Sequence, residues 1–408
     1  MYRNDMIKTS KWKLNATLFI FGQGITLFGS MLVNYAVQWH ITLTSKSGIA
    51  MMLFTLSAAV PMFIISPFAG IWADRHSKKL IINLADAAIA LITLLMGLLF
   101  SLGFEYMALL LICAAARGFG QGVQTPAVNS LLPEIVPERN LLRFNGVNSS
   151  LQSVIMFVSP IVGGVLITVL PIQYVLFVDV ATAAIGISLL LIFVKIPLRE
   201  KIADKKNAWN DLVKGMAYIK NHAFIKKFMI VSALFNFLVA PTALLTMLQT
   251  TRDFGEDTWR LVAIELAFFI GMAFGGVIIG VWGGFKNKSY TIAVATAISG
   301  LCTIGLGLAD NFAIYLFFMA LAGITVSSVN APIMTIIQTK VDADYMGRVF
   351  SVFTMLSSIM MPVGMLLWGP LADVVSIDWL LILSGMGIIV TGALFVVSKT
   401  LREAGISH

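Results

Sequence analysis

Twelve long stretches of mostly apolar residues dominate this sequence. A helix that crosses a bilayer needs about 20 such residues, and its backbone hydrogen bonds are all made within the segment. The strands of a membrane barrel would instead read as alternating segments of about ten residues. The predicted membrane helices are 14–43, 49–72, 80–101, 106–127, 147–170, 174–195, 226–249, 259–282, 289–308, 311–334, 349–371 and 379–398.

Composition excludes a water-soluble fold. Of the 408 residues, 58% are hydrophobic and 12% charged, whereas soluble domains carry roughly 25% charged residues. The predicted fold class is therefore an all-α membrane protein with twelve transmembrane helices. The first run is too long for one straight crossing, so we expect it to tilt or to begin in the interface. It has no small-residue cleavage pattern, which favours a retained helix over a signal peptide.

Basic residues alternate between the loops and predict the orientation. Of the 28 Lys and Arg residues, only Lys46, Arg252 and Arg260 fall in one set of loops, and only Arg117 in a span. Positive charge is retained on the cytoplasmic side, so both termini are predicted to be cytoplasmic in the cell membrane. Topology accounts for the net charge of +8, and no nucleic-acid partner is needed to explain it.

The longest polar interval separates six spans from six. It predicts an N-terminal six-helix bundle at 1–195, a cytoplasmic linker at 196–227 and a C-terminal six-helix bundle at 228–408. Apolar residues recur at helical spacing between Trp209 and Lys220, which indicates an amphipathic helix on the inner membrane surface; a merely solvated linker is the alternative.

The two halves also resemble each other. In each, an apolar span ends near a proline, Pro126 or Pro332, an acidic loop follows, and Arg143 or Arg348 opens the next span. This pattern predicts two parallel six-helix repeats with the substrate site between them.

The loop after the second span, residues 70–79, has the sequence Gly-Ile-Trp-Ala-Asp-Arg-His-Ser-Lys-Lys. It resembles the Gly-x-x-x-Asp-Arg-x-Gly-Arg/Lys-Lys motif of the major facilitator superfamily, except that serine replaces the second glycine. Glycine permits close helix approach, and aspartate can cap the positive end of a neighbouring helix. The resemblance implies a conformational latch against the start of the eleventh helix, made of Gly70, Asp74, Arg75, Lys78, Lys79 and Arg348.

The fourth span contains Arg117, which is costly in hydrocarbon and should face the protein interior with a partner. It resembles the fourth-helix motif Arg-x-x-Gln-Gly of the same family, although Gln121 is displaced by one position. A purely structural pair with a nearby carboxylate is the alternative role for Arg117.

The fifth span contains Ser159, Pro160, Gly163 and Gly164. They resemble the Gly-Pro-x-x-Gly-Gly signature of antiporters in this superfamily, with serine in place of the first glycine. The proline kinks the helix, the glycines offer a flat packing face, and the signature favours export over uptake.

Across nearly the whole chain, the sequence resembles the macrolide-efflux group of drug:proton antiporters, on residues that include Asp74, Asp179, Glu265, Gly271 and 345–351. That resemblance implies an efflux pump.

Carboxylates inside spans are candidates for proton coupling, because an ionised acid in hydrocarbon must be paired, neutralised or hydrated. We expect coupling to involve Asp86, Asp179, Glu265 and Arg117, with Glu265 the acid most directly concerned. Asp179 and Glu265 could instead be interfacial, and Asp86 could make a helix-packing hydrogen bond.

Amide side chains on otherwise apolar helices are candidates for the substrate cavity. Together with 21 Met and 28 Phe residues, they suit a permissive pocket for varied apolar ligands. The amides are Asn34, Gln38, Asn148, Gln152, Asn236 and Asn330.

The predicted function is secondary export of small lipophilic compounds by proton antiport, from a monomer without cofactor or metal. The sequence has no phosphate-binding loop for an ATPase, and nothing in it indicates an enzyme. A same-fold importer, a lipid or siderophore transporter, and a non-transporting receptor remain as alternatives.

Overall fold

The computed structural model describes residues 12–194, 216–342 and 345–405. Within them, twelve helices are long and apolar enough to cross a membrane, which confirms the predicted spans. The first six are α1 (Trp12–Ser45), α2 (Gly48–Arg75), α3 (Lys78–Ser101), α4 (Met107–Ile135), α5 (Glu138–Val169) and α6 (Ile172–Ser188), which continues as a π-helical turn, η1 (Leu189–Phe193).

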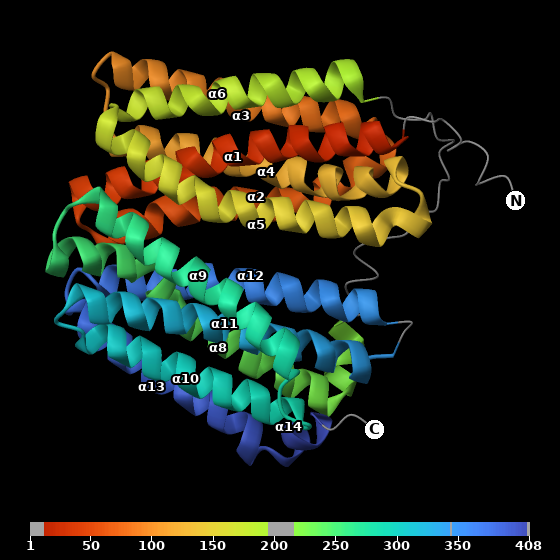
Figure 1. The fold of residues 1–408 in the computed structure, drawn as a ribbon, viewed down its shortest axis with the longest axis vertical. Helices are drawn as coiled ribbons and strands as arrows, with labels where there is room; N and C mark the ends of the chain where they lie inside the picture. Colours follow the sequence, from red (N-terminus) through yellow and green to blue (C-terminus); the bar gives the residue numbers. More distant parts are fainter. Residues whose placement is uncertain (1–11, 195–215, 343–344, 406–408) are drawn as a thin grey trace, which may run out of the picture. The chain divides into compact units, whose positions relative to one another are not determined.

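The second six follow the same plan. They are α8 (Ala223–Gln249), extended by the π-helical turn η2 (Thr250–Phe254), then α9 (Thr258–Trp282), α10 (Lys288–Leu308), α11 (Phe312–Lys340), α12 (Met346–Leu371) and α13 (Ile377–Val397), with a short α14 (Lys399–Ala404). Figure 1 labels these helices.

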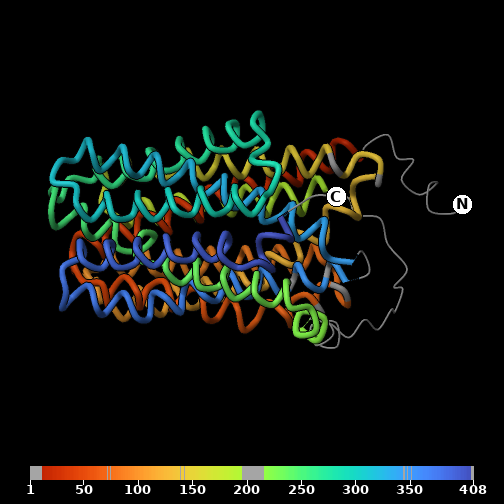
Figure 2. The backbone as a smooth tube through the Cα atoms, turned by 90° about the horizontal axis from the view of Figure 1, so that it is seen from below, coloured from red at the N-terminus to blue at the C-terminus, as the bar shows by residue number. Residues whose placement is uncertain are grey.

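The chain forms two compact units, one of Met1–Ile41 with Leu53–Asp204 and one of Thr42–Met52 with Lys205–His408. The loop between α1 and α2 therefore groups with the second unit, although the chain around it belongs to the first. Most of the predicted amphipathic linker helix lies outside the described residues; its last part, 216–221, is helical. In Figure 2 the long helices of each unit lie alongside one another.

Helix pairing repeats between the units. In the first, α3 packs against α4 and α6; in the second, α10 packs against α11 and α13. These are the third, fourth and sixth spans of each half, so equivalent spans make equivalent contacts. The predicted six-helix repeat is thus visible in the packing of each unit taken separately.

Glycines permit the closest of these contacts. A Cβ at Gly118 of α4 would overlap the Ala58 carbonyl of α2, and a Cβ at Gly271 of α9 would overlap the Ala320 carbonyl of α11. Without side chains at these positions the helix backbones touch, which is how helices associate where lipid is as apolar as the side chains. The two contacts occupy equivalent places in the repeat.

The expectation that spans end near Pro126 and Pro332 was wrong. Both prolines lie inside helices, because α4 continues to Ile135 and α11 to Lys340. A proline removes one backbone donor and kinks a helix, but neighbouring helices and local adjustments compensate in membrane proteins, so the helix can continue beyond it.

Candidate functional site

A buried ion pair lies within the first unit. Arg117 of α4 places Nη1 2.5 Å from Oδ2 of Asp179 on α6. Their side chains are 8% and 1% exposed, respectively. Arg117 therefore has the interior partner that its cost in hydrocarbon requires, and Asp179 is buried inside the protein.

Two hydroxyl groups complete this pair. Thr93 of α3 donates to Oδ2 of Asp179 at 3.0 Å and also receives a hydrogen bond from Arg117. Ser30 of α1 donates to Oδ1 of Asp179 at 3.2 Å. The Asp179 carboxylate thus joins helices α1, α3, α4 and α6, and we call these four residues the Arg117–Asp179 network.

One hydrogen-bond donor of the Arg117–Asp179 network is unused within the described part of the chain. Nη2 of Arg117 is buried and has no hydrogen-bond partner among the described residues. Arg117 lines a small cavity of about 40 Å³, together with Asn34 and Gln121. The guanidinium of Arg117 is thus buried with one unused donor beside a cavity. If Asp179 lost its charge, this cation would have no countercharge among the described residues, and the network would be destabilised.

Asp86 of α3 lies in a separate group of amides. Its Oδ1 accepts from Nε2 of Gln124 at 2.7 Å, and its Oδ2 is 3.4 Å from Nε2 of Gln23. Gln124 also donates to Oε1 of Gln23 at 3.3 Å. Asp86 is 1% exposed, and these contacts, which were expected from the sequence as the alternative to proton coupling, link α3 to α1 and α4.

The same residues line the larger cavity of the first unit, which has a volume of about 430 Å³. Asn34, Asn148 and Gln152, which were predicted from the sequence, lie in its wall. Sequence reasoning missed four other amides of the wall. For Gln23 a signal was available, because Gln23, Ser30 and Asn34 recur at helical spacing on α1. The missed amides are Gln23, Gln121, Gln124 and Asn129.

The second unit has its own cavity, of about 360 Å³. The predicted Asn236 and Asn330 lie in its wall with hydroxyl residues and with Phe235 and Phe353, and none of its lining residues in the described part of the chain is charged. Gln38, also predicted to line a cavity, lines neither of these two nor the small one beside Arg117.

Glu265 lies on α9 and is partly exposed. Among the described residues it has no ion-pair or hydrogen-bond partner, and it lines none of the three cavities above. Its neighbour Arg260 pairs with Asp257 at 3.4 Å instead. The coupling role of Glu265 stays a prediction.

The predicted latch residues form contacts inside their own unit. Lys78 donates to Oε1 of Glu134 at 2.9 Å and to the Ser130 carbonyl at 3.0 Å. Lys79 donates to the carbonyls of Leu191 and Val194 at 2.9 and 2.8 Å. These bonds tie the start of α3 to the ends of α4 and η1.

The remaining latch residues lie in the last part of α2 and the first turn of α12. Arg75 is exposed, Gly70 has open space beside it, and the side chain of Asp74 lies outside what the structure describes. In the second unit, Arg348 lies over the Tyr345 ring at 5.4 Å. The latch role of this set stays a prediction.

In the fifth span, Pro160 lies inside α5, and Gly163 and Gly164 are buried. A Cβ at Gly163 would be 3.4 Å from Leu32 and 3.8 Å from Trp39 of α1, which are ordinary contact distances. Gly163 therefore packs on α1, and a methyl group at this position would make ordinary contacts there.

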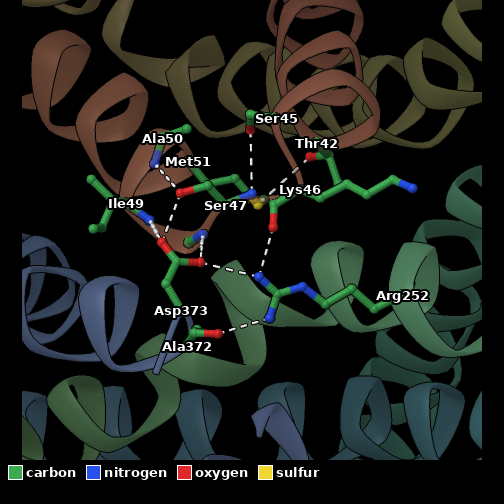
Figure 3. Close-up of polar contacts among 11 residues, drawn as sticks. Thr42, Ser45, Lys46, Ser47, Ile49, Ala50, Met51, Arg252, Ala372 and Asp373 are labelled. Carbon is green, nitrogen blue, oxygen red and sulfur yellow. Dashed lines mark hydrogen bonds and ion pairs between the residues drawn. The ribbon is translucent and has the colours of Figure 1, made fainter. Parts of the chain in front are cut away.

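A polar cluster in the second unit was not anticipated from the sequence. Asp373, just after α12, accepts hydrogen bonds from Ser47 Oγ at 2.7 Å and from the backbone N–H groups of Gly48 and Ile49 at 2.8 and 3.0 Å (Figure 3). Arg252 binds the same carboxylate at 3.1 Å. Asp373 thus caps the N-terminus of α2.

Arg252 extends this cluster to the backbone. It donates to the carbonyls of Ala372 at 2.7 Å and Lys46 at 2.6 Å (Figure 3). Burial alone would raise the pKa of Asp373, but the hydrogen bonds from Ser47, the two backbone N–H groups and Arg252 outweigh it and lower that pKa below its ordinary value. The carboxylate is therefore ionised at neutral pH and holds residues 46–49 by charge-assisted bonds.

Comparison with known proteins identifies the family of this chain. A sequence profile of the Major Facilitator Superfamily matches residues 16–365. The chain belongs to the major facilitator superfamily. Macrolide efflux protein A of Streptococcus pyogenes is 28% identical, covering 94% of this chain and 96% of the relative. Multidrug efflux pump Tap of Mycobacterium bovis (strain BCG / Pasteur 1173P2) is 21% identical, over 95% and 94%.

Solved structures agree on the major facilitator fold. The nucleoside transporter NupG superposes with a TM-score of 0.70 at 14% identity, covering 94% of this chain and 99% of the other. A bacterial homologue of the human lysosomal transporter Spinster gives a TM-score of 0.70 at 14% identity, covering 98% of each chain. At this identity the likeness speaks for the fold alone.

Proposed function

We propose that this member of the superfamily exports small lipophilic molecules from the cell by proton antiport. The observation that carries the proposal is the pair of buried polar groups in the first unit, the Arg117–Asp179 network and Asp86 in its amide-lined cavity. The efflux proteins that resemble this chain over more than nine-tenths of its length support the direction of transport.

The buried acids suit an exchange of protons for substrate. A carboxylate inside a span is stable when it is protonated, paired or bound to a cation, so binding of one partner favours release of the other. Asp179 has Arg117 as its partner, whereas within the described parts of the chain Asp86 has only amide donors. Glu265 on α9 is the third coupling candidate.

The remaining assignments complete the proposal. Both termini face the cytoplasm because the basic loops lie on that side, and a monomer suffices because each unit contains its own cavity. Gly70, Asp74, Arg75, Lys78, Lys79 and Arg348 would control exchange between states, and Pro160, Gly163 and Gly164 would shape the fifth helix.

The test is transport into proteoliposomes that contain the purified chain. A panel of macrolides and lipophilic amines is supplied outside, and an acid lumen is imposed so that exchange against protons drives substrate inward. The expected result is accumulation that exceeds the passive trapping of these weak bases in protein-free liposomes with the same gradient and that a protonophore abolishes. Accumulation only with the opposite gradient would indicate proton symport and favour an importer, and no accumulation under either gradient would contradict the proposal.

A further inference from the structure

We propose that Asp86, with Gln23 and Gln124, forms a recognition site for the protonated amine of a lipophilic ligand in the cavity of the first unit. This site would define the substrate class of the proposed function. Transport of an amine rests on the proposed function, whereas binding of an amine does not. The site is distinct from Glu265, which the sequence singled out.

The charge of the cavity selects a cation. Among the described residues that line the cavity of about 430 Å³, Asp86 is the only charged one. Arg117, the buried basic side chain of the same unit, is already paired with Asp179 and lines a different, smaller cavity. A ligand in the larger cavity therefore meets one negative charge and no positive one.

The bonding of Asp86 leaves room for a ligand. A carboxylate has two oxygens with about four acceptor positions. Gln124 occupies one position on Oδ1 at 2.7 Å, and Gln23 makes a long contact to Oδ2 at 3.4 Å. The two amides orient the carboxylate without neutralising it, so acceptor positions remain for an ammonium group.

Burial of the Asp86 carboxylate is unfavourable, and a bound cation would offset that cost. Asp86 is 1% exposed, and no Lys, Arg or His among the described residues pairs with it. A buried carboxylate without a countercharge is unfavourable unless it binds a proton or a cation. An ammonium ligand would supply the missing charge, whereas a purely structural hydrogen bond would be served equally well by a neutral amide.

The rest of the wall suits the apolar body of such a ligand. Met31, Met62 and Met156 line the cavity beside Leu27 and Ile89. Methionine side chains adapt to ligands of varied shape, and the volume lies in the range of about 300–1,000 Å³ that is usual for drug-sized molecules. None of the described residues in the wall of the second unit's cavity is charged, so they offer an amine no such partner.

The test uses two probes that differ in one group. Diphenhydramine carries a tertiary amine that is protonated at neutral pH; in its neutral analogue an isopropyl group replaces the dimethylamino group. Binding of each to the purified full-length chain in detergent is measured by titration calorimetry without any gradient. The variants are Asp86→Asn, Asp86→Glu and, as a matched control, Asp310→Asn, which removes an acid from an exposed loop.

We expect Asp86→Asn to weaken binding of the amine by at least about tenfold, the loss of one charge-assisted contact, and to leave the neutral analogue within about twofold. Asp86→Glu should keep the preference for the amine, and Asp310→Asn should bind like the wild type. Equal affinity of wild type and Asp86→Asn for the amine, or equal loss for both probes, would overturn the proposal. A chain that binds the amine through Asp86 but does not transport it would refute the proposed function alone.

Discussion

The Arg117–Asp179 pair offers the sharpest test of how charge is held inside this protein. Asp179→Asn leaves the guanidinium of Arg117, whose side chain is 8% exposed, without a countercharge. Removing one partner of a buried pair costs about 3–5 kcal/mol. We expect the lower end of this range, about 3 kcal/mol, for two reasons. The oxygen of the introduced amide would still accept a hydrogen bond, and the hydrogen bonds that are lost contribute less stability inside a membrane than burial alone suggests. The equilibrium constant for unfolding then rises by about two orders of magnitude.

The compensating change is Arg117→Gln. Alone, it leaves Asp179 buried and unpaired and should destabilise by a similar amount. Combined with Asp179→Asn, it replaces the ion pair by two neutral amides, and most of the stability should return because no buried charge remains. The two single variants and the double variant form a double-mutant cycle that isolates the pair.

The chain contains its own reporter for this measurement. Cys113 and Cys302 are buried and free, so a thiol-reactive fluorogenic dye reports unfolding in detergent as the temperature rises. The single variants should unfold several degrees below the wild type and the double variant close to it. Equal midpoints for all four proteins would refute the argument that the pair is a buried, desolvated one. Loss of proton-driven transport in a stable double variant would show that the pair also serves coupling.

The remaining predictions concern four other positions. Asp373→Asn should speed hydrogen exchange in residues 42–52. Because folding lowers the pKa of Asp373, the stabilisation of this segment by the carboxylate is present at neutral pH. It should be lost as the pH falls below about 4 and the carboxylate is protonated. Gly163→Leu should impair efflux while Gly163→Ala, which fits at 3.4 Å, pumps normally; equal activity would remove Gly163 from the mechanism. Glu265→Gln should abolish proton-driven efflux and spare exchange at equal pH, and retained pH dependence would make Glu265 structural. Asp74→Asn should slow transport without loss of protein from the membrane, and an unchanged rate would contradict the latch.

Hydropathy alone determined the number and type of the spanning elements. Runs of about 20 apolar residues can satisfy their backbone in lipid only as helices, and the structure contains the twelve helices that these runs predict. Helix ends were less certain, since Pro126 and Pro332 do not end α4 and α11. The need of Arg117 for a partner also followed from the sequence, because the cost of a charge in hydrocarbon is a local property.

Which residues meet was decided only by the tertiary structure. Asp179 is the partner of Arg117 because α4 and α6 present these faces to each other, and Asp86 meets Gln23 and Gln124 from two other helices. Hydropathy does not indicate which face of a spanning helix meets a neighbour, since lipid and protein interior are equally apolar. The sequence therefore determined where charges and amides occur along the chain, and helix packing determined which of them come within bonding distance.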